Sequence, residues 1–303
     1  MKIAVSGATG LIGTALRRAL EQRGDDVVPL VRRQPKPGEH VVAWHPERGT
    51  IDRAGLEGMD AVIHLAGENV FGRWTAAKKQ RIRASRVAGT TLVSETLASL
   101  QRRPATLLAA SAIGYYGNRG AEPVTEASAP GDDFLAQVSR DWEAAPAVAV
   151  RAGIRVVNMR IGVVLTPAGG ALATMLPPFR LGLGGWVGSG NQYVSWIALD
   201  DIIKAMAHVL DRHDLTGPVN LTAPAPVTNR ELAKTLGRVL GRPVLVGVPG
   251  FALSLAFGSE GADMLQGGQR VLPERLTASG FRFSFTELEP ALRHLLAPSE
   301  RAR

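Results

Sequence analysis

Residues 2–13 read Lys-Ile-Ala-Val-Ser-Gly-Ala-Thr-Gly-Leu-Ile-Gly, and this stretch decides the fold. Its apolar start predicts a buried strand, and the apolar residues after Gly10 predict a helix. Gly7 permits the positive φ of a tight strand-to-helix turn, Gly10 allows close approach of a ligand, and Gly13 allows helix and sheet to pack closely. The free N–H groups and the dipole of the helix start suit a pyrophosphate. The stretch predicts a dinucleotide site, with a plain strand-to-helix turn as the alternative.

The second predicted strand, residues 26–31, ends in Arg32-Arg33. In the NAD version of this fold an acidic residue about 20 positions beyond the glycines binds the ribose 2′-hydroxyl. Two guanidinium groups at that place suit a 2′-phosphate instead. We therefore favour NADP(H) over NAD(H); the alternative is a pair of surface arginines at the start of a loop.

Strands and helices alternate over the first 165 residues, which predicts an α/β fold with a parallel, doubly wound Rossmann-type sheet and right-handed crossovers. Further strands are expected at 40–44, 60–67, 106–110 and 155–160, and helices at 75–100 and 134–145. The small Ala66-Gly67 pair after the fourth strand would let a ribose or adenine lie across the strand end. His64, inside an apolar run, is interpreted as a packed, hydrogen-bonded histidine.

The chain is expected to divide into two parts. Residues 1–165 with about 192–222 form the NADP-binding domain, and residues 166–191 and 223–303 form a smaller substrate-side lobe with a C-terminal module at about 249–297. The run 166–191 shows no helix or strand period and is interpreted as a substrate-side loop or lid, or as an extended crossover. Thr228-Asn229-Arg230-Glu231 predicts a capping box, and residues 244–248 predict a strand closed by Pro249-Gly250.

Composition narrows the class of protein. The chain has 303 residues, a net charge of +8 and 45% hydrophobic residues. It has no cysteine, which excludes disulfides and thiolate metal sites. No metal-ligand spacing appears, so no metal site is expected. Neither a signal peptide nor an apolar run of about 18 residues is found, so we expect a cytoplasmic protein without a membrane span. The basic run from Arg73 to Arg86 is interpreted as a solvated helix face, and nucleic-acid binding is not expected.

These motifs resemble the extended short-chain dehydrogenase/reductase superfamily, which includes nucleotide-sugar epimerases and dehydratases. Within it the chain is similar to the "epimerase family protein" subgroup with its C-terminal module of unknown function. The motifs that carry the resemblance are the three spaced glycines, His64-Leu65-Ala66-Gly67, Tyr116-Gly117 with Thr125-Glu126, and residues 111–117, 142–145, 178–185, 188–192 and 267–273.

The resemblance implies an NADP(H)-binding oxidoreductase or epimerase-like protein acting on a hydroxyl or carbonyl group of a polar substrate, with nucleotide-linked compounds among the candidates. The residues assigned to the cofactor site are Gly7, Thr9, Gly10, Leu11, Ile12, Gly13, Arg32, Arg33, Leu65, Ala66, Gly67, Ser111 and Arg160. A monomer and a homodimer both remain compatible with the sequence.

The catalytic pattern of the superfamily is incomplete in this chain. Its enzymes use a serine after the fifth strand and a Tyr-x-x-x-Lys on the next helix, whereas residues 134–143 read Phe-Leu-Ala-Gln-Val-Ser-Arg-Asp-Trp-Glu. The remaining catalytic candidates are Ser111, Tyr115 and Tyr116. Ser111 could orient a substrate oxygen or the nicotinamide amide, or cap its loop. Two functions stay open: an NADP-dependent enzyme, and a non-catalytic NADP(H)-binding regulator or scaffold.

Overall fold

The computed structural model describes residues 1–248, 258 and 266–297. An eight-stranded sheet runs in the order β13-β8-β6-β5-β1-β2-β3-β4, and its pairs are parallel except β3–β4. The strands are β1 (Lys2–Ser6), β2 (Asp26–Val31), β3 (Val42–His45), β4 (Thr50–Ile51), β5 (Ala61–His64), β6 (Thr106–Ala112), β8 (Arg155–Ile161) and β13 (Gly217–Leu221). The chain moves outward from β1 on one side and from β5 on the other. The predicted doubly wound α/β fold is confirmed.

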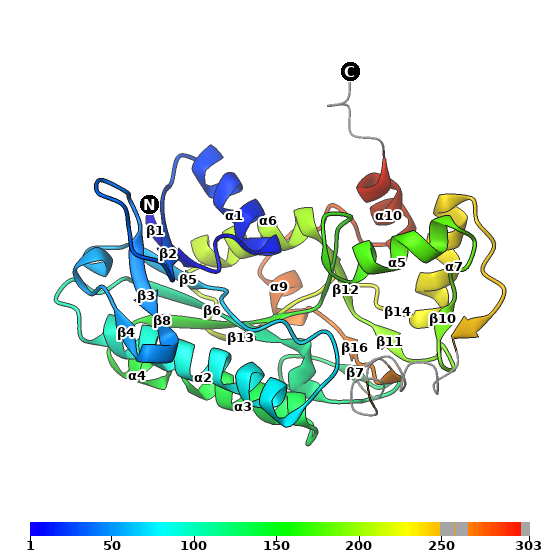
Figure 1. Ribbon diagram of the computed structural model, residues 1–303, viewed down its shortest axis with the longest axis horizontal. Helices are drawn as coiled ribbons and strands as arrows, with labels where there is room; N and C mark the ends of the chain where they lie inside the picture. The colour runs from blue at the N-terminus through cyan, green and yellow to red at the C-terminus, as the bar shows by residue number, and fades with distance from the viewer. Residues whose placement is uncertain (249–257, 259–265, 298–303) are drawn as a thin grey trace.

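Helices cover both faces of this sheet (Figure 1). Leu16 of α1 (Leu11–Gln22) and Met206 of α6 (Leu199–Asp211) are buried against one face. On the other face Val93 of α2 (Ala76–Ala98) and Ala149 of α4 (Ala147–Arg151) are buried, and α3 (Phe134–Ala144) packs beside α2. A strand covered on both faces needs apolar residues at every position, which is why the central strands read as unbroken apolar runs rather than alternating ones.

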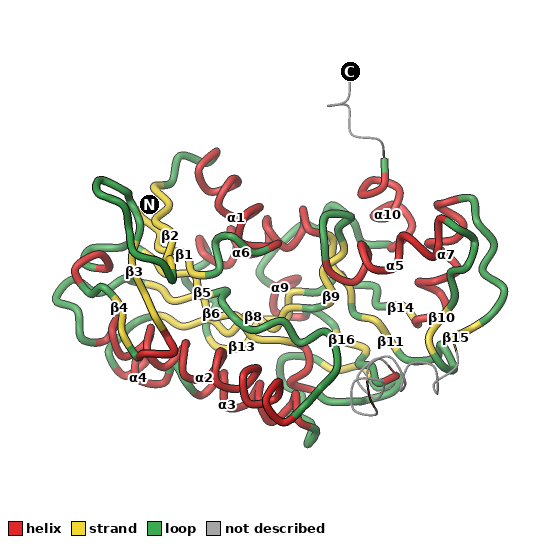
Figure 2. Tube along the Cα trace, in the orientation of Figure 1, coloured by secondary structure: helices red, strands yellow, loops and turns green. Residues whose placement is uncertain are grey.

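A second core lies beside the sheet and includes Leu176, Trp196, Leu236 and Leu292. Its elements are β9 (Val163–Leu165), α5 (Gly170–Arg180), β10 (Trp186–Val187), β11 (Tyr193–Val194), β12 (Trp196–Ala198), β14 (Val227–Thr228), α7 (Asn229–Leu240), β15 (Gly247–Val248) and α10 (Leu288–Leu296). Figure 2 shows short strands and connecting loops between these helices. The capping box predicted at the start of α7 is confirmed. Placement of this lobe on the substrate side stays a prediction.

The helix α5 corrects the interpretation of residues 166–191 as a run without helical period. Leu172, Leu176 and Phe179 are buried on one side of it, at the spacing of a helix face. Pro177 and Pro178 lie in its second half and hide that spacing, because proline removes backbone donors and usually marks a break.

The C-terminal segment returns to the large sheet. Strand β16 (Arg270–Val271) pairs in parallel with β7 (Pro123–Val124), and α9 (Glu274–Ala278) lies beside β13. Val271 is fully buried with Ile113 and Tyr116 of the short helix η3 (Ile113–Tyr116). Two further short helices, η1 (Pro46–Arg48) and η2 (Ala54–Leu56), flank β4. Pro249-Gly250 and much of the predicted C-terminal module lie outside the described residues.

Candidate functional site

The glycine turn after β1 has the geometry that the sequence predicts. Gly7 has a φ of 68°, in the left-handed region. A Cβ atom on Gly7 would lie 3.0 Å from the backbone nitrogen of Ala66, so the turn touches the loop that leaves β5. A Cβ on Gly13 would lie 2.1 Å from the carbonyl oxygen of Gly7, which no side chain can satisfy. The turn therefore requires glycine at both positions.

The start of α1 is open to an anion. Gly10 is its N-cap, no side chain caps the helix, and its first turn holds no acidic residue. Thr9 and Gly10 are exposed. The first N–H groups of a helix lack partners within the helix, and its dipole favours negative charge at that end. The turn thus fits a pyrophosphate, as a dinucleotide would place there.

Ser6 joins the turn to the loop that leaves β5. Its Oγ accepts hydrogen bonds from the N–H groups of Leu65 and Ala66, at 3.1 and 3.3 Å, and lies 2.7 Å from Nδ1 of His64. His64 is fully buried, and burial lowers the pKa of its imidazole to about 4. The prediction of a packed, hydrogen-bonded histidine is confirmed. The role of Ser6 was not foreseen, because a serine in an apolar strand gives no sign of its partners.

The two arginines at the end of β2 differ in their surroundings. Arg32 is exposed and has no hydrogen-bond or ion-pair partner within residues 1–248, 258 and 266–297. The guanidinium of Arg33 forms a two-pronged ion pair with Glu39, with 2.7 Å between Nη1 and Oε2. Only Arg32 is therefore free to bind an anion without displacing a protein group.

Ser111, at the end of β6, is 2% exposed and donates its hydroxyl proton to Oε1 of Glu143, at 2.6 Å. Arg160 of β8 donates to both oxygens of that carboxylate, at 2.8 Å each. The side chains of Glu143 and Arg160 are 10% and 3% exposed. Glu143 was quoted only as part of a motif, and its link to Ser111 across 32 positions left no signal in the sequence.

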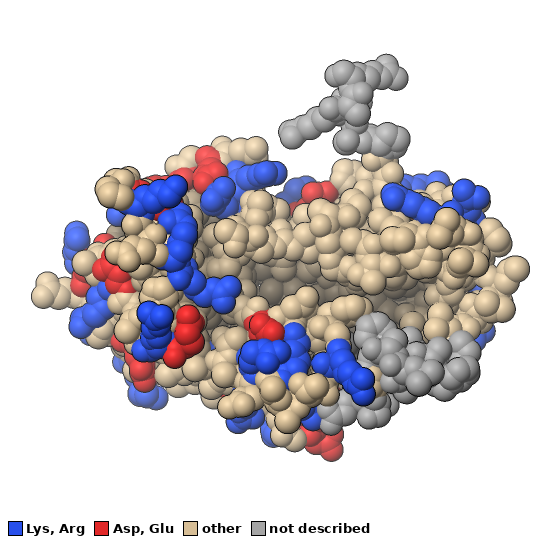
Figure 3. Space-filling model, in the orientation of Figure 1, with Lys and Arg blue, Asp and Glu red and all other residues tan. Residues whose placement is uncertain are grey.

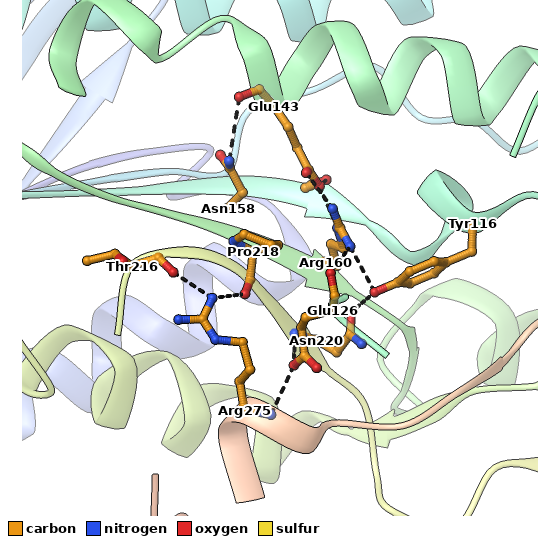
Figure 4. Close-up of polar contacts among 10 residues, drawn as sticks. Tyr116, Glu126, Glu143, Asn158, Arg160, Thr216, Pro218, Asn220 and Arg275 are labelled. Atoms are coloured by element: carbon orange, nitrogen blue, oxygen red, sulfur yellow. Dashed lines mark hydrogen bonds and ion pairs between the residues drawn. The ribbon is translucent and has the colours of Figure 1, made fainter. Parts of the chain in front are cut away.

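Arg160 also contacts both predicted tyrosines, and Figure 4 shows its contact with Tyr116. Its Nη1 donates to the Tyr116 hydroxyl at 2.9 Å, and that hydroxyl donates to Oδ1 of Asn220 at 2.7 Å. Tyr116 has no exposed surface, and burial raises the pKa of its phenol to about 12. Tyr115 differs because it is half-buried, and its ring centroid lies 3.5 Å from the Arg160 guanidinium carbon. Of the three catalytic candidates, only Tyr115 keeps appreciable exposed surface.

The hydrogen bonds around Tyr116 and Arg160 continue into the C-terminal segment. Nδ2 of Asn220 donates to the Leu272 carbonyl at 2.9 Å. The Glu126 carboxylate accepts the N–H groups of Asn220 and Arg275 at 3.0 and 3.3 Å, and burial raises its pKa. The Arg275 guanidinium binds two carbonyl groups beside β13 (Figure 4). The Glu126 carboxylate thus links its loop to β13 and α9, and the C-terminal segment holds Asn220 in place beside Tyr116.

Two carboxylates form ion pairs with part of the basic run at residues 73–86. Lys78 pairs with Glu68 at 3.0 Å, and Arg83 pairs with Asp141. Arg86 is largely withdrawn from solvent, and this burial lowers its pKa to about 10.

The visible face of the molecule is hollowed along its middle, between α1 and α5 on one side and α2 and α3 on the other (Figure 3). Lys and Arg side chains gather at the left end of this hollow in Figure 3. Within the described residues no cluster of His, Cys, Asp or Glu could hold a metal ion, and no helix is long and apolar enough to cross a membrane.

Comparison with known proteins identifies relatives over nearly the whole chain. The model of the NAD dependent epimerase/dehydratase family matches residues 3–221, and that of a domain of unknown function matches residues 248–295. An epimerase family protein of Mycobacterium tuberculosis is 44% identical, covering 96% of each chain.

Two crystal structures from the same comparisons are also similar. That of the human epimerase family protein SDR39U1 (isoform 2) with NADPH has a TM-score of 0.89 and 36% identity, covering 97% of this chain and 99% of that one. That of a nucleoside-diphosphate sugar epimerase from Corynebacterium glutamicum has a TM-score of 0.79 and 36% identity, covering 98% of this chain and 58% of that one.

Proposed function

The chain belongs to the NAD dependent epimerase/dehydratase family, and on this premise we propose that it is an NADP(H)-dependent oxidoreductase or epimerase. Its substrate would be a small polar molecule with a reacting hydroxyl or carbonyl group, nucleotide-linked compounds included. The observation that carries the cofactor assignment is the exposed guanidinium of Arg32, directly after β2, which has no partner among the described residues. The NADPH bound to the human relative supports the same choice.

The proposed cofactor site lies at the carboxyl ends of β1, β2 and β5, where the strand order changes direction. The N–H groups at the start of α1 would hold the pyrophosphate. Arg32 would hold the 2′-phosphate, and Leu65–Gly67 would lie against the adenosine half. When bound, the nicotinamide supplies or accepts a hydride.

Tyr115 is the proposed proton carrier. A carbonyl that gains a hydride needs a proton on its oxygen, and a phenol can donate one if its conjugate base is stabilised. The Arg160 guanidinium on the Tyr115 ring provides a positive charge for that purpose. Ser111 and Tyr116 have a different proposed role, because they donate their hydroxyl protons to Glu143 and Asn220. In this proposal Ser111 and Tyr116 position Arg160 and do not touch the substrate.

The locked hydroxyls of Ser111 and Tyr116 also favour a second candidate, a non-catalytic NADP(H)-binding regulator. Both candidates share the cofactor site and differ only in turnover. Fluorescence quenching with NADPH and NADH tests the shared site, with tighter binding of NADPH expected. Equal affinity for both would contradict the 2′-phosphate assignment.

Turnover separates the two candidates. Carbonyl compounds should oxidise NADPH, hydroxyl compounds should reduce NADP+, and nucleotide sugars should be converted to their epimers without net change of the cofactor. The rate for whichever substrate reacts should collapse in Tyr115→Phe while NADPH affinity is unchanged. Tight NADPH binding without turnover of any compound would select the regulator. A Tyr115→Phe protein as active as the unaltered one would remove Tyr115 from the proposal.

A further inference from the structure

We infer that Glu39 determines how strongly the site prefers NADP(H) to NAD(H), because its carboxylate occupies the anion-binding fork of Arg33. This inference rests on the proposed cofactor site. It concerns a residue in the loop after β2, beyond the positions assigned to the cofactor from the sequence.

The contact between Arg33 and Glu39 is a fork-to-fork pair. Nη1 of Arg33 lies 2.7 Å from Oε2 of Glu39, and Nη2 binds Oε1. The backbone N–H of Lys36 donates to Oε2 at 3.0 Å, which fixes the carboxylate in the loop. Gly38, with a φ of 77°, turns the chain so that Glu39 folds back on Arg33. The N–H of Glu39 closes this turn on the Lys36 carbonyl at 3.0 Å.

A carboxylate and a phosphate compete for such a fork. Both present two oxygens at the spacing of two guanidinium N–H groups, so only one can occupy the fork. A 2′-phosphate must either displace Glu39 from Arg33 or bind Arg32 alone with a negative charge beside it. Glu39 therefore opposes NADP(H) at the same place where Arg32 attracts it.

The same carboxylate suits the unphosphorylated cofactor. A ribose 2′-hydroxyl is a hydrogen-bond donor, and an acidic group near the end of the second strand binds it in NAD-dependent proteins of this fold. Glu39 offers such an acceptor from the following loop rather than from the strand end. The free protein thus carries one group for each cofactor, Arg32 for the phosphate and Glu39 for the hydroxyl.

If Glu39 had only a structural role, its substitution would change the two cofactor affinities in a different way than loss of a competitor would. The pair with Arg33 is exposed, with side chains 52% and 27% accessible, and exposed ion pairs contribute little to stability. If Glu39 only anchored its loop, its loss would weaken both cofactors alike. If it competes for the fork, its loss strengthens NADPH and not NADH.

The test is the ratio of dissociation constants for NADPH and NADH, measured by fluorescence quenching in Glu39→Gln and in Glu47→Gln. Glu47 is an exposed glutamate on η1, and Arg33 pairs with Glu39 instead, so substitution of Glu47 makes the same change in net charge and leaves the Arg33 fork occupied. Glu39→Gln should tighten NADPH binding about fivefold and leave NADH binding equal or weaker, as expected for release of one exposed charged partner. Glu47→Gln should leave the ratio unchanged.

The experiments distinguish a wrong role for Glu39 from a wrong cofactor site. If Glu39→Gln has the same ratio as Glu47→Gln, or binds NADPH more weakly, the inference is wrong while the cofactor site stands. If neither NADPH nor NADH binds the unaltered protein, the proposed function itself fails and takes the inference with it. An Arg32→Ala variant that keeps its NADPH affinity would move the proposed 2′-phosphate contact from Arg32 to the Arg33 fork, where Glu39→Gln should still tighten NADPH binding.

Discussion

The single hydroxyl proton of Ser111 is donated to Glu143, with 2.6 Å between the two oxygens. Glu143 lies on α3, the helix on which the superfamily resemblance would place the Tyr-x-x-x-Lys pair. Arg160 binds the same carboxylate, so the charge of Glu143 is balanced inside the protein. Ser111, a candidate for the serine that the superfamily uses in catalysis, is thus hydrogen-bonded to a buried ion pair. Loss of that pair should therefore first affect the stability of the fold.

Replacing Glu143 by glutamine should strongly destabilise the protein. The Arg160 side chain is 3% exposed and would lose its counter-charge. Removing one partner of a buried pair costs about 3–5 kcal/mol, because the other charge stays buried. Urea unfolding followed by circular dichroism measures the loss.

Asp141→Asn is the matched control for Glu143→Gln, since Asp141 lies on the same helix and its pair with Arg83 is 39% and 51% exposed. An exposed pair contributes at most about 1 kcal/mol. Equal free energies of unfolding in the two variants would show that the Glu143–Arg160 pair does not carry the stability assigned to it.

The two neighbouring tyrosines should respond differently to loss of the hydroxyl. Tyr116→Phe leaves a donor of Arg160 and an acceptor of Asn220 without a partner, at a cost of about 1–3 kcal/mol. Tyr115 is half-buried and its hydroxyl has no hydrogen bond among the described residues, so Tyr115→Phe should barely change stability. Thermal unfolding of both variants provides the comparison. A larger loss in Tyr115→Phe would reverse the assigned roles.

These contacts mark the limit of what the sequence could predict. The alternation of strands and helices and the glycine turn follow from local patterns: apolar runs, helix faces and a fixed glycine spacing. The partners of Tyr116 and Arg160 do not, because Tyr116 and Asn220 are 104 positions apart and meet only when the sheet is assembled. Local pattern carries no information about such a pair.

The structure differs from the sequence-based predictions at two other places, and each difference has a physical cause. The helix α5 was missed because two prolines lie in its second half, although Leu172, Leu176 and Phe179 form a helical face. Arg33 was assigned to a phosphate without its partner Glu39, because the turn at Gly38 that brings them together belongs to an irregular loop. The position of Arg33 in the sequence therefore does not show that a nearby carboxylate, Glu39, already occupies its guanidinium.

Adding one methyl group at Gly13 should disrupt the cofactor turn. In Gly13→Ala the new Cβ would lie 2.1 Å from the carbonyl oxygen of Gly7, a backbone atom that cannot move without shifting the turn. Overpacking of this kind costs about 1–3 kcal/mol or more. NADPH affinity should fall below detection, because the turn and the helix start move together.

Gly89→Ala serves as the control for Gly13→Ala. Gly89 lies within α2, where a Cβ would be 3.8 Å from its nearest neighbours, an ordinary contact. Alanine is favoured over glycine in a helix by about 1 kcal/mol, so this variant should be at least as stable as the unaltered protein. If Gly13→Ala bound NADPH as well as Gly89→Ala does, the turn could not have the close packing described above.

The protein should lose stability as the pH falls from 6.5 to 4, and His64 should account for part of the loss. Burial lowers the pKa of its imidazole from 6.5 to about 4. Within that window the unfolded chain binds a proton at this histidine and the folded chain does not, so acid favours unfolding. Stability is therefore fully present above pH 6.5, and about 3 kcal/mol is lost on reaching pH 4.

Urea unfolding at several pH values between 7 and 4 measures this slope. His64→Asn should be less stable at pH 7, because the ring and its contact with Ser6 are lost, yet its stability should depend less on pH. His213 is exposed, so its imidazole is hydrated whether or not the chain is folded, and His213→Asn should keep the slope of the unaltered protein. If the slope survives in His64→Asn, the acid sensitivity arises elsewhere and His64 is not the neutral, buried group that holds the loop after β5.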